Sequence, residues 1–278
     1  MPKSYTFYFY PVIMQTLTDQ TGRKIILKYY LSRIVSLVPS QTELLFDLGL
    51  SNEIVGVTKF CVHPAEALST KTIVGGTKKL NIEKIRALNP DLILANKEEN
   101  TREQIEMLAK DFPVWVSDIK TLDDALAMIE SVGALTNKVQ KANSLMKKIT
   151  SEFLKIRNPK SEIRNLACAY LIWHNPIMTT GSDTFINDMM QHCGLQNVFS
   201  GRDRYPEITA QELSEANPEL ILLSSEPFPF GEKHFAHYQS ICPLSKIILV
   251  DGQMFSWYGS RLQYAPEYFF KLVRQIHV

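Results

Sequence analysis

The chain has 278 residues and a formal net charge of +1 at pH 7, with 30 basic and 29 acidic side chains scattered along the sequence. This balance argues against a nucleic-acid partner, and no apolar run approaches the roughly 20 residues of a membrane-spanning helix, so we expect no membrane insertion. The length allows one large or two medium α/β domains. The four cysteines form no C-x-x-C pair and are interpreted as small core residues, with Cys61 as the one candidate for another role.

The N-terminal segment is predicted to be folded protein and not a signal peptide. Its only cation is Lys3, a proline interrupts it, and no small-x-small cleavage site follows. Tyr5–Tyr10 is a β-type aromatic run, and Met14–Thr18 and Lys24–Leu27 flank the turn Asp19–Gly22, which indicates a hairpin. We therefore expect the chain as given to stay cytoplasmic with its cysteines reduced.

A strand that turns sharply into a helix organises the next stretch. Ile34–Val38 reads as a buried strand bounded by Pro39. Ser40, with Glu43 three residues later, predicts a capping box, and Gly49 is a natural helix stop. Such a turn presents free backbone N–H groups to whatever lies above the sheet, although an ordinary βα turn has the same pattern.

Strands and helices then alternate up to residue 132. We expect strands over Ile54–Val57, Asp91–Ala95 and Pro113–Val116, and helices over Ile82–Leu88, Arg102–Lys110 and Thr121–Val132. Asn81 is the expected cap of the first of these helices. This alternation predicts a mostly parallel sheet wrapped by helices.

One long helix separates this region from a second βα region. Thr136–Arg157 lacks proline and glycine and carries apolar residues at helical spacing, which predicts a helix about 30 Å long that ends at Asn158-Pro159. Alternation then resumes, with strands over Leu166–Trp173 and Leu220–Leu223 and helices over Thr184–His192 and Gln211–Ala216. We divide the chain into an N-terminal lobe with its hairpin (1–135), a rigid connecting helix (136–158) and a C-terminal lobe (159–278).

The two lobes carry similar sequences. Asn89-Pro90-Asp91-Leu92-Ile93-Leu94 corresponds to Asn217-Pro218-Glu219-Leu220-Ile221-Leu222, and Gly49-Leu50 corresponds to Gly194-Leu195. Each Asn-Pro segment follows a short helix and leads to a polar loop. This agreement indicates duplication, and two similar lobes facing each other across a cleft are typical of a binding protein.

These motifs resemble a known family. Arg33–Leu37, Pro39–Glu43, Asn81–Ile85 and Asn197–Phe199 with Arg204–Glu207 are similar to the helical-backbone (class III) substrate-binding proteins of ABC importers. The resemblance is closest to the periplasmic cobalamin-binding branch, which has ferric-siderophore-binding and haem-binding relatives. It implies two α/β lobes joined by one long helix, little hinge motion and a ligand in the cleft.

The resemblance also assigns roles to single positions. A tryptophan of the cobalamin-binding branch falls on Thr77, and a second falls on Tyr205, where an aromatic side chain is retained. The family docks on its membrane permease through one glutamate per lobe. Glu83 matches the first, and the second falls on Gln211 with Glu212 beside it.

Residues that follow strands or lead into helices are the ligand-binding candidates. The N-terminal lobe is expected to contribute Pro39, Ser40, Lys59, Phe60, Cys61, His63, Thr77, Lys78, Asn96 and Lys97. The C-terminal lobe is expected to contribute Trp173, Asn175, Tyr205, Glu226, Phe228, Trp257 and Tyr258. The last two belong to Asp251–Arg261, which is interpreted as an aromatic-rich loop whose rings are not expected to be core residues. Cys61 and His63 are too few for a metal site, so we expect none. Lys59, Lys78 and Lys97 suit the carboxylates of haem or an anionic siderophore better than the amide rim of cobalamin.

We interpret the chain as an ABC-transporter-type binding protein for a metal chelate, namely cobalamin, a ferric siderophore or haem. It is expected to be a monomer without a resident cofactor and to have an ABC permease as a possible partner. One alternative is a cytoplasmic carrier for a corrinoid, haem or metal chelate that is not coupled to a permease. A hydrolase is disfavoured, because Ser40, Ser182 and Ser224 lie in no G-x-S-x-G motif and no H-E-x-x-H or P-loop is present.

Overall fold

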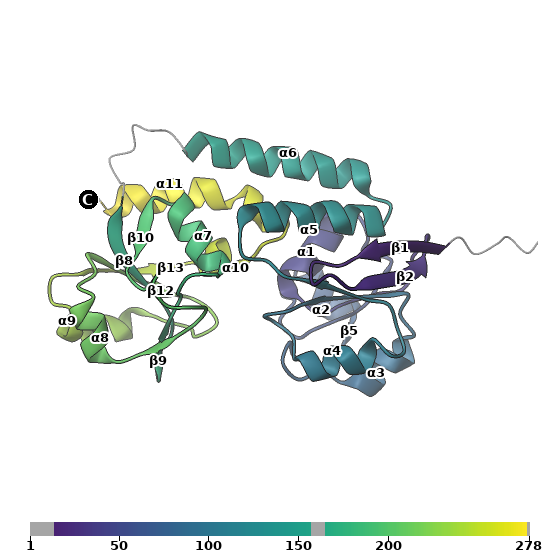
Figure 1. Ribbon diagram of the computed structural model, residues 1–278, viewed down its shortest axis with the longest axis horizontal. Coiled ribbons are helices and arrows are strands. Elements are labelled where there is room, and N and C mark those ends of the chain that lie inside the picture. The colour runs from purple at the N-terminus through teal and green to yellow at the C-terminus, as the bar shows by residue number, and fades with distance from the viewer. Residues whose placement is uncertain (1–13, 157–164, 277–278) are drawn as a thin grey trace, which may run out of the picture.

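Two α/β lobes lie side by side beneath a long helix in the computed structural model, which describes residues 14–156 and 165–276 (Figure 1). The predicted fold class is correct. The strand-to-helix alternation of the sequence dictates this architecture, because a parallel strand pair needs a crossover between its strands.

The sheet of the N-terminal lobe is entirely parallel, in the order β5-β4-β3-β6-β7. Its strands are β3 (Ile34–Ser36), β4 (Ile54–Val57), β5 (Thr72–Ile73), β6 (Leu92–Asn96) and β7 (Val114–Ser117). The lobe's helices are α1 (Pro39–Asp47), α2 (Glu66–Thr70), α3 (Ile82–Leu88), α4 (Arg102–Leu108) and α5 (Leu122–Leu135).

The C-terminal lobe has a mixed sheet. Its order is β11-β9-β8-β12-β13, with β10 also paired to β8, and the pairs that β9 forms with β8 and β11 are antiparallel. The strands are β8 (Leu166–Trp173), β9 (Ile177–Thr179), β10 (Leu195–Asn197), β11 (Glu207–Ile208), β12 (Leu220–Ser224) and β13 (Lys246–Val250). The helical segments are α7 (Phe185–His192), α8 (Ala210–Glu215), η1 (Glu232–His234), α9 (Phe235–Ile241), α10 (Gln253–Ser256), η2 (Ser260–Gln263) and α11 (Ala265–Ile276).

The predicted hairpin is present as β1 (Met14–Thr18) and β2 (Lys24–Lys28), which pair antiparallel. The Asp19 carboxylate accepts from the backbone N–H groups of Thr21 and Arg23, both at 2.9 Å, and closes the turn. The predicted aromatic run Tyr5–Tyr10 lies outside the described residues.

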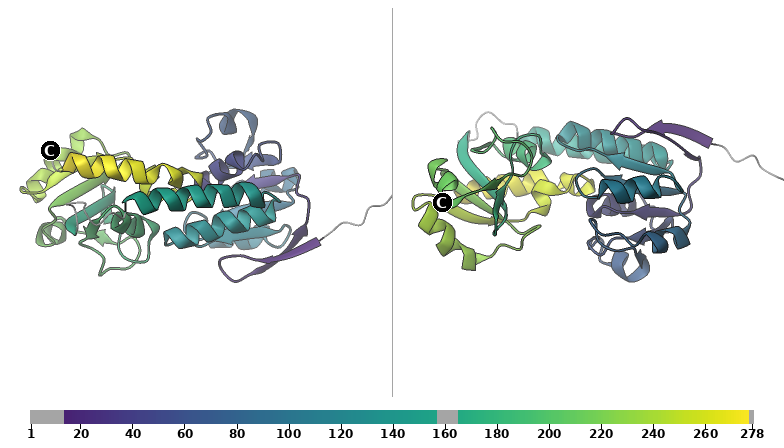
Figure 2. Two further views of the ribbon diagram at one scale, coloured as in Figure 1. Left: turned by 90° about the horizontal axis from the view of Figure 1, so that it is seen from above. Right: turned by 60° about the horizontal axis from the view of Figure 1, so that its bottom comes forward.

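The connecting helix is α6 (Val139–Ile156), which begins later than predicted. α5 continues to Leu135. Asn137, with φ +57°, adopts a left-handed conformation that separates α5 from α6. α6 packs against α5 of one lobe and α11 of the other, so it crosses the junction (Figure 2). The predicted helix end at Asn158-Pro159 lies outside the described residues.

The backbone confirms the similarity of the two lobes. Asn89 ends α3 and Asn217 follows α8, and both residues have a φ of +44°. Gly49 and Gly194 have φ values of +78° and +83°, so both helix stops use the left-handed conformation that glycine allows. The central strands also correspond, since β3 and β6 are neighbours as β8 and β12 are.

Two predictions near the junction need correction. Pro39 occupies the first turn of α1 and Val38 is its N-cap, without a side-chain hydrogen bond, so the capping box of Ser40 and Glu43 does not form. The stretch Asp251–Arg261, predicted as a loop, contains α10 and the start of η2. A proline is preorganised for the first helical position, which places Ser40 inside the helix.

One hydrophobic core runs through both lobes. It joins Leu44 of α1 with Phe185, Phe255 and Tyr258 of the C-terminal lobe, and it includes Ile149 of α6. A smaller cluster lies on the opposite face of each sheet. None of the helices in residues 14–156 and 165–276 is long and apolar enough to cross a membrane.

Candidate functional site

The loops that follow β4, β6 and β12 and the segment after β13 meet at the junction between the lobes. In open α/β sheets, ligands bind at the edge of the sheet that carries such loops. Across the junction the Arg261 guanidinium donates to both oxygens of the Glu43 carboxylate, at 2.6 and 3.0 Å. The two side chains are only 13% and 15% exposed, so this bidentate contact is largely shielded from water.

The backbones of the lobes also touch beside this ion pair. A Cβ atom placed on Gly259 would lie 2.3 Å from the carbonyl oxygen of Ser40, so only glycine fits there. Next to this contact, the hydroxyls of Ser40, Tyr258 and Ser260 are buried without a hydrogen-bond partner among the described residues. Unpaired buried hydroxyls are costly. Burial raises the pKa of the Tyr258 hydroxyl, and the nearby Ser40 hydroxyl partly offsets this rise.

Trp257 connects the two walls of the junction. Its ring lies 5.4 Å from the His63 ring of the N-terminal lobe, and the Arg261 guanidinium lies over it at 5.0 Å. Its indole Nε1 donates to Glu226 Oε1 at 2.9 Å, and Ser256 Oγ donates to the same oxygen at 2.7 Å. Trp257 and Tyr258 are nonetheless buried, and Tyr258 belongs to the hydrophobic core, a role that the sequence had disfavoured for this aromatic-rich stretch.

Glu98 and Glu99 follow β6 and lie at the same junction. Glu98 forms an ion pair with Arg204 of the opposite lobe. The Glu99 carboxylate is half-buried and has neither a hydrogen bond nor an ion pair within the described residues, and burial, together with the nearby Glu226 carboxylate, raises its pKa to about 7. Burial raises the pKa of Tyr205, and the charges of Glu98 and Glu99 add to this shift.

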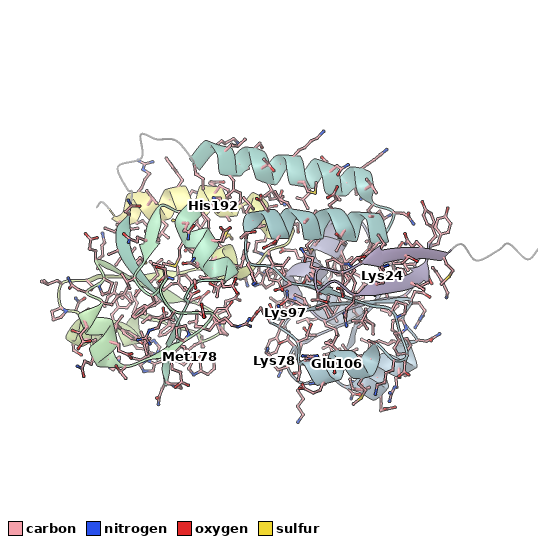
Figure 3. The ribbon with its side chains drawn as sticks, viewed as in Figure 1. Lys24, Lys78, Lys97, Glu106, Met178 and His192 are labelled. Atoms are coloured by element: carbon pink, nitrogen blue, oxygen red, sulfur yellow. The ribbon has the colours of Figure 1, made fainter. Side chains whose placement is uncertain are left out.

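The three predicted lysines lie on the N-terminal lobe, and Figure 3 shows Lys78 and Lys97 on the side that faces the other lobe. Lys97 is paired with Asp118 at 2.6 Å, and the Lys78 amino group donates to the backbone carbonyl of Glu98. Lys59 lies over the ring of Phe60 at 5.0 Å. Because the charge of Lys97 is matched locally, these lysines favour an anionic ligand less than the sequence suggested.

Two predicted site residues have structural roles. Cys61 is fully buried, where its sulfur accepts from Thr42 Oγ1 at 3.1 Å, and burial raises its thiol pKa. Asn96 is also buried, and its side chain accepts from the backbone N–H groups of Glu98 and Glu99. Neither side chain is available to a ligand. Thr77, by contrast, is half-buried beside Lys78, and Pro39 is buried at the start of α1.

Trp173, Asn175 and Phe228 belong to a separate aromatic group of the C-terminal lobe. The Trp173 ring lies 5.5 Å from that of Phe228, and its indole donates to the Asn175 carbonyl at 3.1 Å. Phe228 also packs against His174 and His234. Trp173 is 39% exposed, and the hydrogen bonds and ring contacts of this group within the described residues all stay inside the C-terminal lobe.

The predicted docking residues lie on α3 and α8, which are on the same side of the molecule, one on each lobe (Figure 1). Glu83 is 81% exposed and paired with Arg86. Glu212 accepts from Thr209 and Arg202 as the capping residue of α8, and these contacts lower its pKa to about 2. Gln211 is exposed and donates to Glu215 at 2.7 Å, so it is the accessible member of the pair.

The structure adds four residues that the sequence prediction missed as site residues, namely Glu43, Glu99, Arg204 and Arg261. One signal could have found Glu99, because it lies in the loop after β6, next to Glu98, which corresponds to Glu226 in the loop after β12. Arg261 and Glu43 are 218 positions apart, and no local pattern pairs them. No group of three or more His, Cys, Asp and Glu side chains suited to a metal ion occurs in the part of the chain that the structure describes.

Comparison with known proteins identifies the family to which this chain is similar. A family model described as periplasmic binding protein matches residues 34–237. The chain is 29% identical over 216 residues to an uncharacterized ABC transporter substrate-binding lipoprotein, YvrC, of Bacillus subtilis, which covers 74% of this chain and 68% of the relative. It is 27% identical over 241 residues to the vitamin B12-binding protein of Pectobacterium carotovorum, which covers 84% and 86%.

Two solved structures share the fold. The periplasmic vitamin B12-binding protein BtuF of Vibrio cholerae superposes with a TM-score of 0.75 at 22% identity, over 89% of this chain and 98% of that chain. The periplasmic haem-binding protein RhuT of Roseiflexus has a TM-score of 0.75 at 21% identity, over 88% and 98%. At these identities the likeness establishes the fold alone.

The raised pKa of Glu99 predicts a pH-dependent stability. Unfolding returns this pKa from about 7 to its ordinary 4.5, so between these values the folded state binds more protons and the free energy of unfolding falls as pH rises. At pH 8 we expect Glu99→Gln to raise the free energy of unfolding by about 1–3 kcal/mol, so that the variant unfolds at a higher urea concentration than wild type. At pH 5 the two proteins should unfold at nearly the same urea concentration.

Urea unfolding followed by circular dichroism at the two pH values measures this difference. Glu103→Gln, which removes an exposed acid on α4, is the matched control and should change little at either pH. Equal effects of Glu99→Gln at pH 5 and pH 8 would contradict the assignment of a buried, repelled carboxylate.

Proposed function

Because this chain belongs to the periplasmic binding protein family, we propose that it is the substrate-binding protein of an ABC-type importer, with a large metal chelate as ligand. The chemical class is cobalamin, haem or a ferric siderophore. The relatives support this class, since one is a vitamin B12-binding protein and a protein of the same fold binds haem. The family is one of binding proteins, and we propose that this chain catalyses no reaction.

One structural observation carries the proposal. Loops that follow strands of both sheets meet at the same junction, and this junction holds aromatic rings, charged groups and unpaired buried hydroxyls together. A large flat ligand is bound mainly through aromatic and apolar area, while a few polar groups set its orientation. Phe60, Tyr205 and Trp257 supply the first kind of contact, and Ser40, Glu226 and Arg204 supply the second.

The junction would bind such a ligand without extensive rearrangement. The core is continuous between the lobes, and α6 packs on both of them. A site that is already formed loses less conformational entropy on binding, which favours affinity.

For delivery, we propose that the face carrying α3 and α8 docks on the membrane permease. Glu83 offers an exposed carboxylate on one lobe, and Gln211 with Glu215 offers an amide and a carboxylate on the other. A carboxylate can accept two charge-assisted hydrogen bonds from an arginine of the permease, which an amide cannot match. Glu212 contributes to α8 itself and not to docking.

The ligand proposal is tested by tryptophan fluorescence. We expect one of cyanocobalamin, haemin or a ferric hydroxamate siderophore to quench the emission saturably, because a chromophore between the lobes lies close to Trp257. Trp257→Phe should remove most of the saturable quenching, whereas Trp115→Phe, at a fully buried site in the N-terminal lobe, should keep it. If none of the three chelates binds, the proposed ligand class is wrong.

The docking proposal predicts that a variant can lose affinity for the permease while it keeps its affinity for the chelate. Glu83→Gln should weaken binding of the loaded protein to the permease complex isolated from the native host by about ten-fold, the loss of roughly one charge-assisted contact. The affinity for the chelate should stay unchanged. Glu106→Gln on the neighbouring α4 (Figure 3) is the control and should alter neither affinity. Equal loss of both affinities in Glu83→Gln would refute the docking role.

A further inference from the structure

An acidic residue follows a central strand in each lobe. β6 ends at Asn96 and is followed by Glu99, and β12 ends at Ser224 and is followed by Glu226. The two strands hold corresponding places in their sheets, since β6 pairs with β3 as β12 pairs with β8. In the repeat Glu226 corresponds to Glu98, and Glu99 is the next residue of the same loop. The loops after β6 and β12 therefore both bring carboxylates to the junction, where the charges of Glu99 and Glu226 interact.

Glu226 is held in a defined orientation. Oε1 accepts from Ser256 Oγ and from Trp257 Nε1, while Oε2 accepts no hydrogen bond from the residues that the structure describes. Gly252 leaves room for this arrangement, because a Cβ atom there would lie 2.6 Å from Cγ of Glu226. One oxygen of a fixed, half-buried carboxylate thus remains free to accept from a ligand.

Glu99 is positioned by its backbone and not by its side chain. Its N–H donates to Asn96 Oδ1 at 3.0 Å, whereas its carboxylate forms no hydrogen bond or ion pair between residues 14–156 and 165–276. The charge of the adjacent Glu98 is compensated by Arg204. The Lys78 amino group is directed at the Glu98 carbonyl, so it neutralises Glu99 only from a distance.

Several titratable groups surround these two carboxylates, and few of them carry a positive charge. Glu99 is close enough to Glu226, Glu98, Lys78, Tyr205 and Tyr258 for their charges to interact with its own, and it also acts on the Cys61 thiol. Asp251 and Arg261 act in the same way on Glu226. The unpaired hydroxyls of Ser40 and Tyr258 lie beside them.

We propose that Glu99 and Glu226 form a charge filter that binds a hydrogen-bond-donating, uncharged or cationic edge of the ligand and excludes ligands that place carboxylates there. This inference rests on the proposed function and narrows its ligand class. Carboxylates only accept hydrogen bonds, so amide N–H groups or an ammonium group complement them. The propionates of haem or a carboxylate siderophore would instead add like charges in a partly dehydrated site.

The filter also responds to pH near neutrality. Burial and the Glu226 carboxylate raise the pKa of Glu99 to about 7, so this group is mostly ionised at pH 8 and mostly protonated at pH 6. A cationic ligand should therefore bind more tightly as pH rises, and a ligand with carboxylates more tightly as pH falls. Because only one proton is gained or lost at Glu99, the dissociation constant of either kind of ligand should change by at most about ten-fold per pH unit.

The test measures dissociation constants at pH 6 and pH 8 for three probes of different charge. Cyanocobalamin has a rim of uncharged amides, haemin carries two propionates, and ferric desferrioxamine carries an ammonium group. We expect haemin to be the weakest ligand of the wild type at pH 8. Glu99→Gln and Glu226→Gln should improve its affinity at pH 8 by about five- to ten-fold and weaken that of the preferred probe by a similar factor.

Glu99→Gln should in addition abolish the pH dependence between the two values. Glu267→Gln, an exposed acid of α11, is the matched control and should leave all three affinities unchanged. Haemin that binds most tightly at pH 8, with an affinity that neither Glu99→Gln nor Glu226→Gln alters, would overturn the filter and leave the proposed function intact. If no probe binds the wild type at either pH, the proposed function fails and the filter with it.

Discussion

The ion pair between Glu43 and Arg261 sets the relation between the two lobes. It joins the first helix of the N-terminal lobe to η2 near the C-terminus, and the backbones of Ser40 and Gly259 touch beside it. A partly buried pair of this kind is costly to break, because either partner alone would leave an uncompensated charge. The core that continues from Leu44 to Phe255 reinforces the same junction. The lobes therefore form one body, and a ligand at the proposed site must fit the separation that this contact imposes.

This constraint explains why the binding groups converge. With the lobes fixed, the loops after β4 and β6 face those around Arg204 and Trp257, through the contacts of Glu98 with Arg204 and of His63 with Trp257. The charges of Glu98 and Arg204 compensate each other, while Glu99 and Glu226 retain free oxygens. In the proposed charge filter, selectivity depends on which charges are already paired inside the protein and which remain for a ligand.

The sequence predicts the parts of this structure that local chemistry determines. β8 has its predicted bounds, Asn81 caps α3 as expected, and the duplicated Asn89 and Asn217 adopt the same left-handed conformation. Local signals failed where distant contacts decide. The burial of Trp257 and Tyr258 depends on packing against the other lobe, and Pro39 displaced Ser40 from the cap position. The pair of Glu43 and Arg261 is visible only in three dimensions, and the lysines of the N-terminal lobe suggested an anionic ligand only because their partners were unknown.

The distance between the lobes tests the account most directly. Spin labels at Glu106→Cys on α4 and Ala236→Cys on α9, both exposed positions, report this distance by pulsed electron paramagnetic resonance. The four native cysteines are buried, so labelling should be confined to the two introduced positions. A fixed junction predicts one narrow distance distribution that shifts by less than about 2 Å when a saturating chelate is added. A broad distribution without ligand, or a larger shift toward shorter distances on binding, would show a hinged closure and contradict a site held at constant width by Glu43 and Arg261.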